Sequence, residues 1–599
     1  MMYSVKNIPF GNYLCDFFPK IFSKDKGVEL LAEKNDKYGY FIERNEKSIK
    51  IKYSDLSHLA TAVGDIISGT EQENFSHPLN FRGLMLDSSR NAVYNIDFLK
   101  ETITKLALMG MNYFCLYTED TYEVEGEPLI GYSRGRYSKK ELKEFVLFAE
   151  QFGITMFPCI QTLGHLEQIL KYSHYSDFRD NDRVLNTSFP KTYDLISKLI
   201  SNASEPYKSN LIHLGMDETW GIGRGKTFKA NTPINPTKIY AEHVAKVAKI
   251  CEEKGLKPVI WADFVLGSSG EKAMDNESIS IIPKNLILNY WNYYSNDEKK
   301  YQLDIEKIKN MGFDCIASPG LWNWGNFFPD FKRVRETTYP MMKTLHQEKF
   351  EKVMMTMWGD DGNECFFSSC WLALSYYFTL CRGIKDVENS YRKRAEHICC
   401  IDFAKFARFE KIGRLPYDSD GKRIPTPKMY FYEDPLYPAA VLMHEKNDIP
   451  LFHGLSKFYS KTKSSNFNKL YKFTSLFCEI TALKLTIAEK LIKNYPSNRK
   501  KLKKVANHLK YLSKKVEKLH SLYRTLWLQE RKPFGLEEMD YRLAGLNARI
   551  KISSTTIKSY LKGKLNRISE LEEKIPLELL KMQDINTARK LRTKSLSLW

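Results

Sequence analysis

Eight strand-like segments alternate with helix-like segments from Phe81 to about Leu380, and this alternation restricts the fold more than any other feature of the chain. Several helix-like stretches end at a glycine, a common helix stop before the next strand. Eight successive βα units predict a (β/α)8 TIM barrel, an α/β fold whose active site lies at the C-terminal ends of the strands. A doubly wound open sheet is the competing architecture, but no G-x-G-x-x-G follows the first strand. The strand candidates are Arg82–Leu86, Asn112–Tyr117, Ile154–Ile160, Leu211–Leu214, Lys257–Trp261, Leu286–Trp291, Phe313–Ala317 and Val353–Trp358, and the helix candidates include Ile96–Met109, Lys139–Phe152, Thr237–Lys254 and Leu303–Asn310.

Different patterns flank the barrel on both sides. Before it, two strand-like segments and one helix-like segment predict a small α/β domain over residues 1–78. After it, residues 385–599 predict a C-terminal α-helical region, which leaves residues 79–384 for the catalytic barrel. Pro425–Pro438 is rich in Pro and Tyr, and we expect it to cover the barrel as irregular loop. The N-terminal candidates are the strands Tyr38–Arg44 and Ser48–Tyr53, the helix Leu56–Ile67 and the linker Ser68–Leu79; the long C-terminal helix candidates are Leu470–Ile492, Leu502–Leu528 and Leu536–Leu571.

The chain carries a net charge of +19, which raises nucleic acid as a partner. However, the basic run from Arg499 to Lys504 alternates with apolar residues at helical spacing, which indicates a solvated helix face. No nucleic-acid-binding signature accompanies it, so we expect no nucleic-acid partner. We expect no membrane partner either, because no stretch is long and uncharged enough to span a bilayer. The N-terminus lacks a signal-peptide pattern and the eleven cysteines lack zinc-site spacing, so the sequence predicts a cytoplasmic protein without a metal or other cofactor.

Acidic and aromatic residues follow nearly every predicted barrel strand, where a barrel enzyme needs them. The most informative stretch is LIHLGMDETW, residues 211–220, in which Asp217 and Glu218 stand side by side directly after a buried strand. Burial and mutual repulsion separate the pKa values of two such carboxylates, so that one can act as a general acid while the other stays charged. Tryptophans among carboxylates indicate a carbohydrate ligand and glycoside hydrolysis. The strand-end residues are Asp87, Arg90, Glu119, Asp120, His165, Asp217, Glu218, Trp261, Asp263, Trp291, Trp322, Trp324, Trp358, Asp360 and Asp361.

Three motifs together resemble glycoside hydrolase family 20, the β-N-acetylhexosaminidases. They are R-G-L-M-L-D-S-S-R at residues 82–90, the Gly164-His165 step, and H-L-G-M-D-E at residues 213–218. The resemblance covers roughly residues 80–380. It implies that Glu218 is the general acid and base, and that Asp217 accepts a hydrogen bond from the substrate's acetamido N–H. It also implies that the acetamido oxygen of the substrate, and not a protein group, attacks the anomeric carbon. The family is in this respect an exception among glycosidases, most of which use two carboxylates.

The resemblance implies an exo-β-N-acetylhexosaminidase that releases terminal β-linked GlcNAc, or GalNAc, from a glycan with retention through an oxazolinium intermediate. The alternative is a carbohydrate-binding or regulatory protein on a barrel that has lost turnover. Net charge alone motivates a third class, a basic nucleic-acid-binding scaffold. The sequence does not indicate an oligomeric state.

Other substrate contacts also follow from the resemblance. Arg90 matches the arginine that grips the outer hydroxyls, and Asp360 stands where the family often has a glutamate on a distal hydroxyl. Asp120 and His165 match a pair that supports the general acid, and Trp261, Trp291 and Trp358 match aromatic walls around the sugar.

The chain departs from the family at two places. Strand two ends in Glu119-Asp120 instead of two aspartates, and the stretch from Pro319 to Trp324 lacks the tyrosine that holds the acetamido oxygen. We expect Tyr293 or Tyr290 to supply that hydrogen bond, or else the indole N–H of Trp322 or Trp324.

Overall fold

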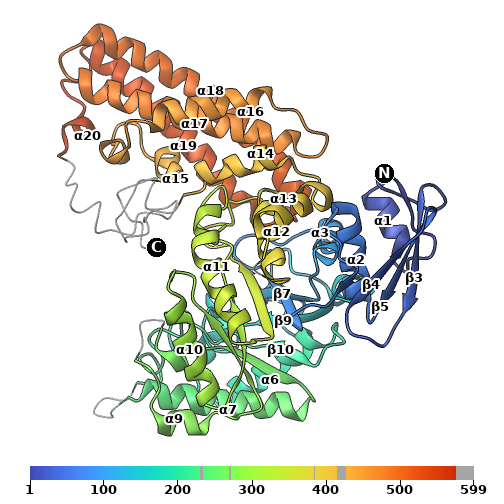
Figure 1. Cartoon of the computed structure of the whole chain (residues 1–599). Helices are drawn as coiled ribbons and strands as arrows, with labels where there is room; N and C mark the ends of the chain where they lie inside the picture. The colour runs from blue at the N-terminus through green and yellow to red at the C-terminus, as the bar shows by residue number, and fades with distance from the viewer. Residues whose placement is uncertain (229–233, 269–271, 384, 415–425, 575–599) are drawn as a thin grey trace.

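The eight barrel strands form one closed, parallel barrel in the computed structural model of the chain, which describes residues 1–228, 234–268, 272–383, 385–414 and 426–574 (Figure 1). Each strand pairs with the next one along the chain, and β14 closes the ring on β7. This confirms the predicted TIM barrel. The strands are β7 (Phe81–Asp87), β8 (Tyr113–Glu119), β9 (Thr155–Ile160), β10 (Leu211–His213), β11 (Lys257–Trp261), β12 (Ile287–Trp291), β13 (Asp314–Ser318) and β14 (Lys352–Met357).

The barrel strands are apolar runs because helices cover one face and the barrel core covers the other. All seven residues of β7 are buried, for example. β8 runs two residues further than its predicted end at Tyr117, through an irregularity in its pairing with β9 that brings Glu119 into the strand. The helices around the barrel are α3 (Ile96–Leu108), α4 (Lys139–Glu150), α5 (Glu167–Leu170), α6 (Lys191–Ser204), α7 (Pro236–Glu253), α8 (Asp263–Leu266), α9 (Asn276–Ile281), α10 (Glu298–Asn310), α11 (Phe331–Gln347) and α12 (Trp371–Leu380), with the 3₁₀ turns η1 (Ser173–Phe178) and η2 (Phe367–Ser369).

The N-terminal residues form a six-stranded sheet in the order β2-β1-β3-β5-β4-β6, with α2 packed between this sheet and the barrel helix α3 (Figure 1). The predicted strand Ser48–Tyr53 has the bounds of β5, and the predicted linker contains the short strand β6. The domain limits at residues 78 and 384 stay a proposal. The elements are β1 (Tyr3–Ser4), α1 (Gly11–Phe17), β2 (Phe22–Ser23), β3 (Val28–Lys34), β4 (Tyr40–Arg44), β5 (Ser48–Tyr53), α2 (Leu56–Ser68) and β6 (Asn74–Phe75).

The C-terminal region is helical, as predicted, with two corrections. The predicted loop Pro425–Pro438 contains the helix α15, so that prediction is wrong within the described residues, which exclude Pro425. The third long helix ends at Leu561 instead of Leu571, because Gly563 takes a left-handed conformation just beyond it. The elements are α13 (Val387–Ile398), α14 (Phe403–Phe406), η3 (Ala407–Lys411), α15 (Pro427–Tyr432), η4 (Ala440–Met443), α16 (Asp448–Lys461), α17 (Asn468–Asn494), α18 (Arg499–Glu530), α19 (Leu536–Leu561) and α20 (Ser569–Glu572).

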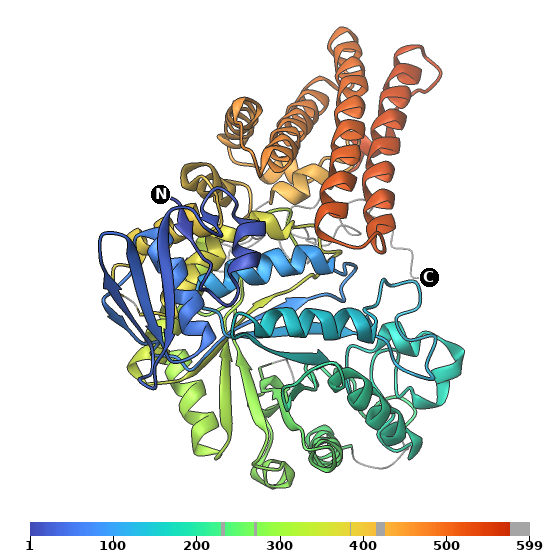
Figure 2. The same ribbon diagram turned by 90° about the vertical axis from the view of Figure 1, so that its right-hand side faces the viewer.

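The turn between α18 and α19 rests on the barrel. Figure 2 shows these two helices, in red, standing side by side with their connecting turn directed at the barrel. Within that turn Lys532 N–H donates to Val93 O at 2.7 Å, and Asn95 N–H donates to Glu530 O at 3.0 Å. The C-terminal region therefore touches the segment that follows β7, at the end of the barrel where an active site is expected.

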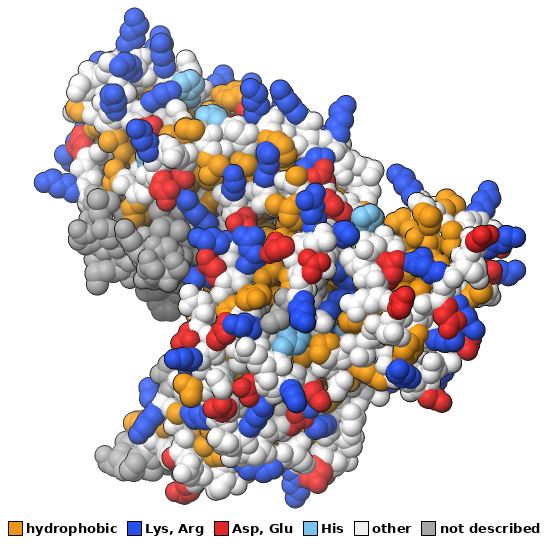
Figure 3. Space-filling view, viewed as in Figure 1, with side chains coloured by type: hydrophobic (Ala, Val, Ile, Leu, Met, Phe, Trp, Pro, Cys, Tyr) orange, Lys and Arg blue, Asp and Glu red, His pale blue; other side chains and the backbone are white. Residues whose placement is uncertain are grey.

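Basic side chains are scattered over the outer surface of the C-terminal helices (Figure 3). In α18, Leu502 and Val505 are buried while Lys501, Lys503 and Lys504 are exposed, which confirms the predicted solvated helix face. No helix in the described part of the chain is both long and apolar enough to cross a membrane.

Candidate active site

Asp217 and Glu218 lie just beyond β10 in a backbone that changes direction at nearly every residue. Gly215, Met216 and Glu218 all have positive φ angles, of 69°, 70° and 46°. Such angles are unfavourable for side-chain-bearing residues and persist only where neighbours hold the backbone. Here Met216 N–H donates to Gln161 Oε1 at 3.1 Å, and Glu218 N–H donates to Asp263 Oδ2 at 3.1 Å. The ends of β9 and β11 thus fix both carboxylates.

Asp217 is a buried carboxylate with two polar partners. Gln161 Nε2 donates to its Oδ1 at 2.8 Å, and His165 Nε2 lies 3.3 Å from its Oδ2. Burial alone would raise the pKa of Asp217, but the charge of His165 and these contacts outweigh it and hold the pKa well below its usual range. Asp217 is therefore ionised at neutral pH.

Glu218 has the opposite tendency. Its side chain is 30% exposed, and His165 Nε2 lies 3.6 Å from its Oε2. Burial and the negative charge of Asp217 raise the pKa of Glu218. Two adjacent carboxyl groups are thus driven toward different charge states, which is the arrangement that separates a general acid from a charged neighbour.

His165 stands against both carboxylates. Burial lowers its pKa, but the Asp217 carboxylate outweighs burial and raises the pKa to about 9. On the other side of the ring, Arg183 Nη2 lies 3.2 Å from Nδ1 and can donate only to a neutral ring. The charge state of His165 is therefore balanced between Asp217 and Arg183.

Arg90 lies among three carboxylates. Its guanidinium nitrogens are 3.0 Å from Asp87 Oδ2, 3.7 Å from Glu119 Oε1 and 3.4 Å from Asp360 Oδ1. The guanidinium also stacks at 4.8 Å from the ring of Trp358. The end of the site near β7, β8 and β14 is therefore rich in groups that bind hydroxyls.

The two acids at the end of β8 have different surroundings. Glu119 accepts a hydrogen bond from Tyr117 at 2.8 Å, and burial raises its pKa to about 7 against the attraction of Arg90. Asp120 is paired instead with Arg134, whose Nε lies 3.2 Å from its Oδ2. Of the two acids, Glu119 is the one that the structure places beside Arg90.

Aromatic side chains enclose the site on the side of β11, β12 and β14. The rings of Trp261 and Trp358 are 5.7 Å apart, and Trp358 Nε1 donates to the hydroxyl of Tyr293 at 3.0 Å. Trp291 stacks on Tyr293 at 5.0 Å, and Trp324 lies 5.4 Å from the same ring. Tyr293 is therefore the centre of this aromatic group.

The structure separates the candidate donors for an acetamido oxygen. Tyr290 donates to Asp304 of α10 at 2.8 Å, because side chains of a strand alternate and this one points away from the barrel interior. Trp322 Nε1 donates to Thr337 of α11 at 3.4 Å. The Tyr293 hydroxyl accepts from Trp358 and also contacts the Thr356 side chain, so of the two tyrosines it is the one whose hydroxyl lies among the aromatic groups of the site.

Sequence reasoning assigned no role to three residues that organise these groups, Gln161, Tyr117 and Asp263. Gln161 donates to Asp217 and to the Tyr117 hydroxyl, and Tyr117 donates onward to Glu119, so one chain of hydrogen bonds joins the two acidic parts of the site. Asp263 appeared as a strand-end acid without a role. Gln161 directly follows β9, and this position is the signal that could have found it.

Comparison with known proteins identifies the family. A model described as "Glycosyl hydrolase family 20, catalytic domain" matches residues 79–357, and one described as "Glycoside Hydrolase 20C C-terminal domain" matches residues 406–589. The chain belongs to glycoside hydrolase family 20.

Two hexosaminidases illustrate how the chain compares with individual relatives. Hexosaminidase D of Bos taurus is 24% identical over 38% of the chain and 67% of its own length, and that of Homo sapiens is 24% identical over 41% and 51%. The chain thus spans about half to two thirds of these relatives. The solved GH20 exo-β-N-acetylglucosaminidase from Vibrio harveyi, in complex with N-acetylglucosamine, has a TM-score of 0.52 at 15% identity, over 70% of this chain and 75% of that one. At this identity the likeness shows the fold.

Proposed function

We propose that this family 20 glycoside hydrolase is an exo-β-N-acetylhexosaminidase that releases terminal β-linked GlcNAc, with GalNAc as the second candidate, from a glycan or glycoconjugate. The observation that carries the proposal is the pair at the end of β10: an ionised Asp217 beside a Glu218 whose pKa is raised. Substrate-assisted hydrolysis needs one carboxylate that stays charged and one carboxylic acid that gives up its proton.

Glu218 acts first as the acid. Its proton passes to the glycosidic oxygen while the acetamido oxygen of the same sugar attacks the anomeric carbon, and the bond to the leaving group breaks. Asp217 accepts the acetamido N–H and stabilises the positive charge that spreads over the oxazolinium ring. Glu218, now ionised, takes a proton from water, which attacks the anomeric carbon and reopens the ring. Each attack inverts the configuration of the anomeric carbon, so the two attacks together retain it.

The remaining groups bind the sugar. Arg90 and Asp360 hold the outer hydroxyls, while Trp261, Trp291 and Trp358 enclose the ring and the N-acetyl methyl. Tyr293 donates to the acetamido oxygen, and His165 tunes the two carboxylates. Glu119 takes the supporting position for which the sequence favoured Asp120, since Glu119 lies within 3.7 Å of Arg90. The intact carboxylate pair argues against a binding protein without turnover.

We also propose a cytoplasmic location. All eleven cysteines lie in described residues as free thiols, as is usual for proteins of reducing compartments.

Turnover of aryl β-glycosides tests the proposed activity. The aryl β-N-acetylglucosaminide and its GalNAc analogue are expected to be hydrolysed with retention, seen by proton NMR of the first product, and the plain β-glucoside is not. A thiazoline mimic of the cyclised intermediate is expected to inhibit far more tightly than the product sugar. Hydrolysis of the glucoside at a comparable rate would refute the mechanism, and sugar binding without turnover of any of the three glycosides would favour the binding protein.

A further inference from the structure

We propose that Lys428 and Arg542, two buried cations of the C-terminal helical region, are positioning residues for Asp360. This inference rests on the proposed function, in which Asp360 binds an outer hydroxyl of the sugar. It assigns to the C-terminal region a part in substrate binding, exerted through the backbone of the segment that joins β14 to η2. Residues 359–364 of this segment are called the β14 loop below.

The β14 loop has an unfavourable backbone. Asp361, Gly362 and Asn363 have φ angles of 57°, 90° and 53°, so three consecutive residues are left-handed. Such a run does not hold by local preference and needs partners on its polar groups. On the barrel side, Gly359 N–H donates to Asp87 Oδ2 at 2.9 Å, and Gly325 N–H donates to Asp360 O at 3.2 Å.

The C-terminal region supplies charges to the other side of the loop. Lys428 Nζ lies 2.5 Å from Asp361 Oδ2 and 2.6 Å from Glu364 Oε2. The Arg542 guanidinium donates to Asp361 O at 2.7 Å and to Glu364 Oε1 at 2.9 Å, and it lies 3.2 Å from Asp361 Oδ1. Two carboxylates of the barrel thus meet two cations from α15 and α19.

This cluster is removed from water. Lys428 and Glu364 are 1% and 2% exposed, and Arg542 is 6% exposed. Charges at such depth are stable only when they are paired, so each member depends on the others. The loop packs directly against the guanidinium at Gly362, because a Cβ at this position would lie only 2.8 Å from Arg542 Nη1. The loop and α19 therefore fit each other at atomic contact.

Neighbouring residues of the C-terminal region extend the same attachment. Arg531 donates to Asn363 O at 2.8 Å and to Asn363 Oδ1 at 3.0 Å, and Tyr523 donates to Glu364 O at 3.2 Å. Tyr432, the last residue of α15, donates to Glu364 Oε1 at 2.5 Å. Asp361, Asn363 and Glu364 are thus held from outside the barrel.

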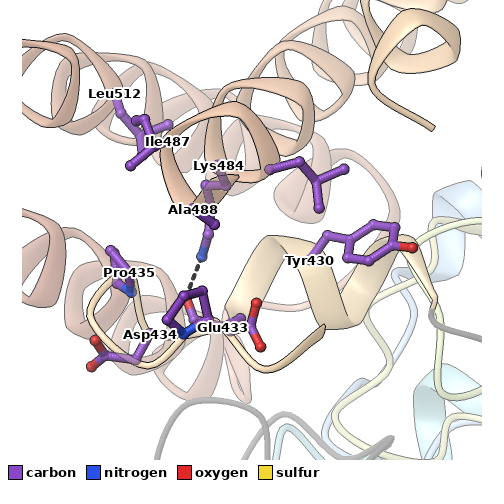
Figure 4. A pocket seen from close by; sticks show the side chains of 10 residues that line it. Tyr430, Glu433, Asp434, Pro435, Lys484, Ile487, Ala488 and Leu512 are labelled. Atoms are coloured by element: carbon purple, nitrogen blue, oxygen red, sulfur yellow. Dashed lines mark hydrogen bonds between the residues drawn. The ribbon is translucent and has the colours of Figure 1, made fainter. Parts of the chain in front are cut away.

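Lys428 is itself held in place, because the C-terminal end of α15 is anchored to α17. Figure 4 shows Lys484 extending from α17 to the segment that follows α15. Its Nζ donates to Phe431 O at 2.6 Å and to Glu433 O at 2.5 Å. These are carbonyls at the end of α15, which have no partner within the helix. Contacts therefore connect α17 to α15 through Lys484, and α15 to the β14 loop through Lys428.

Asp360 is the part of the loop that reaches the substrate site. Its side chain is 48% exposed, and its Oδ1 lies 3.4 Å from Arg90 Nε. A side chain this exposed is little fixed by packing, so its position depends on Arg90 and on the backbone on either side. That backbone is held at Gly359 by the barrel and at Asp361 by Lys428 and Arg542. Loosening the second hold is expected to weaken sugar binding through Asp360.

A double-mutant cycle tests this coupling. Arg542→Gln, Asp360→Ala and the double variant are compared by kcat and KM on the aryl β-N-acetylglucosaminide. Arg542→Gln is expected to raise KM about tenfold with a smaller change in kcat, and to cost almost nothing further in the Asp360→Ala background. Arg542→Lys keeps the positive charge but not the paired N–H donors of the guanidinium, and its KM is expected to lie between those of the wild type and Arg542→Gln.

A matched control is available on the same helix. Arg549 pairs with Asp434 at 2.6 Å, two turns beyond Arg542. Arg549→Gln removes an ion pair of the same helix that is more exposed, with the Arg549 side chain 40% exposed, and that does not touch the β14 loop, and its KM is expected to stay at the wild-type value. If Arg542→Gln does not fold, the cycle is carried out with Arg542→Lys or Lys428→Met.

The outcomes separate the two proposals. Additive effects of Arg542→Gln and Asp360→Ala in a folded protein overturn the positioning role, as does an equal rise in KM for Arg549→Gln. If the wild type has no turnover, the proposed function is wrong, and the cycle is then read from the Kd of N-acetylglucosamine by calorimetry. If that sugar does not bind, Asp360 holds no sugar hydroxyl and the inference fails with it.

Discussion

At the scale of single residues, the site works by giving neighbouring groups opposite tendencies. Asp217 and Glu218 are adjacent in the chain, yet the first is buried against Gln161 and His165, whereas the second is partly exposed and lies farther from His165. The same principle separates Tyr293 from Tyr290, because alternate side chains of a strand face opposite sides. Chemistry therefore depends on which partner each residue meets, more than on residue type.

Removing the Tyr293 hydroxyl tests the donor assignment. Tyr293→Phe keeps the stacking with Trp291 and removes the hydroxyl, which accepts from Trp358 and which we propose donates to the acetamido oxygen. Loss of such a donor typically lowers turnover about a hundred- to a thousandfold, and we expect that loss in kcat with a smaller change in KM. Tyr290→Phe is the matched control, since its hydroxyl bonds to Asp304 outside the barrel. Near-normal turnover of Tyr293→Phe would show that another group holds the oxygen.

The pH profile tests the charge of His165. The proposed mechanism requires Asp217 ionised and Glu218 protonated, so kcat/KM is expected to fall below the pKa of the first and above the pKa of the second. A cationic His165 lowers both pKa values. His165→Gln removes that charge, both pKa values rise, and both limbs of the profile are expected to move to higher pH.

His174 provides a control for this experiment. His174 is exposed and no contact joins it to either carboxylate in the described structure, so His174→Gln is expected to leave the profile in place. An unshifted profile for His165→Gln would mean that the ring is neutral in the working enzyme, as the contact with Arg183 favours.

At the scale of elements, the sequence predicted what local patterns determine. Apolar runs marked all eight barrel strands, and strand-end positions pointed to Arg90, Asp217 and Glu218, because parallel strands bring their C-terminal ends to one place. The irregularity in β8 that brings Glu119 into the strand depends on its pairing with β9, and no spacing in the sequence marks it. Helix α15 was also missed, because contacts with α17 outweigh the proline-rich composition.

The β14 loop shows the limit of sequence reasoning more sharply. Its acids Asp360 and Asp361 are adjacent and look equivalent, but one faces Arg90 of the barrel and the other faces Lys428 and Arg542. These partners lie up to 181 residues away along the chain. Only the packing of the C-terminal region on the barrel distinguishes Asp360, the proposed substrate ligand, from Asp361, the structural ion-pair partner.

At the scale of the whole molecule, the barrel and the C-terminal helices share one aromatic core. Phe327, from the segment after β13, lies 5.2 Å from Phe431 of α15 and 5.0 Å from Phe477 of α17. Phe366, which follows the β14 loop, lies 4.8 Å from Tyr523 of α18. Since these rings are buried, separating the two parts would expose a large apolar surface to water. We therefore expect the barrel and the helical region to unfold together.

Phe327→Ala tests that dependence. The substitution leaves the catalytic carboxylates and the β14 loop charges unchanged, but it empties the centre of the shared aromatic core. A buried Phe→Ala change typically costs about 3 to 5 kcal/mol of unfolding free energy. Because the two parts stabilise each other, the urea midpoint measured by ellipticity and the midpoint measured by residual activity are expected to fall together. Two separated midpoints, with activity lost at the wild-type urea concentration while helical signal falls earlier, would show that the C-terminal helices unfold independently of the barrel.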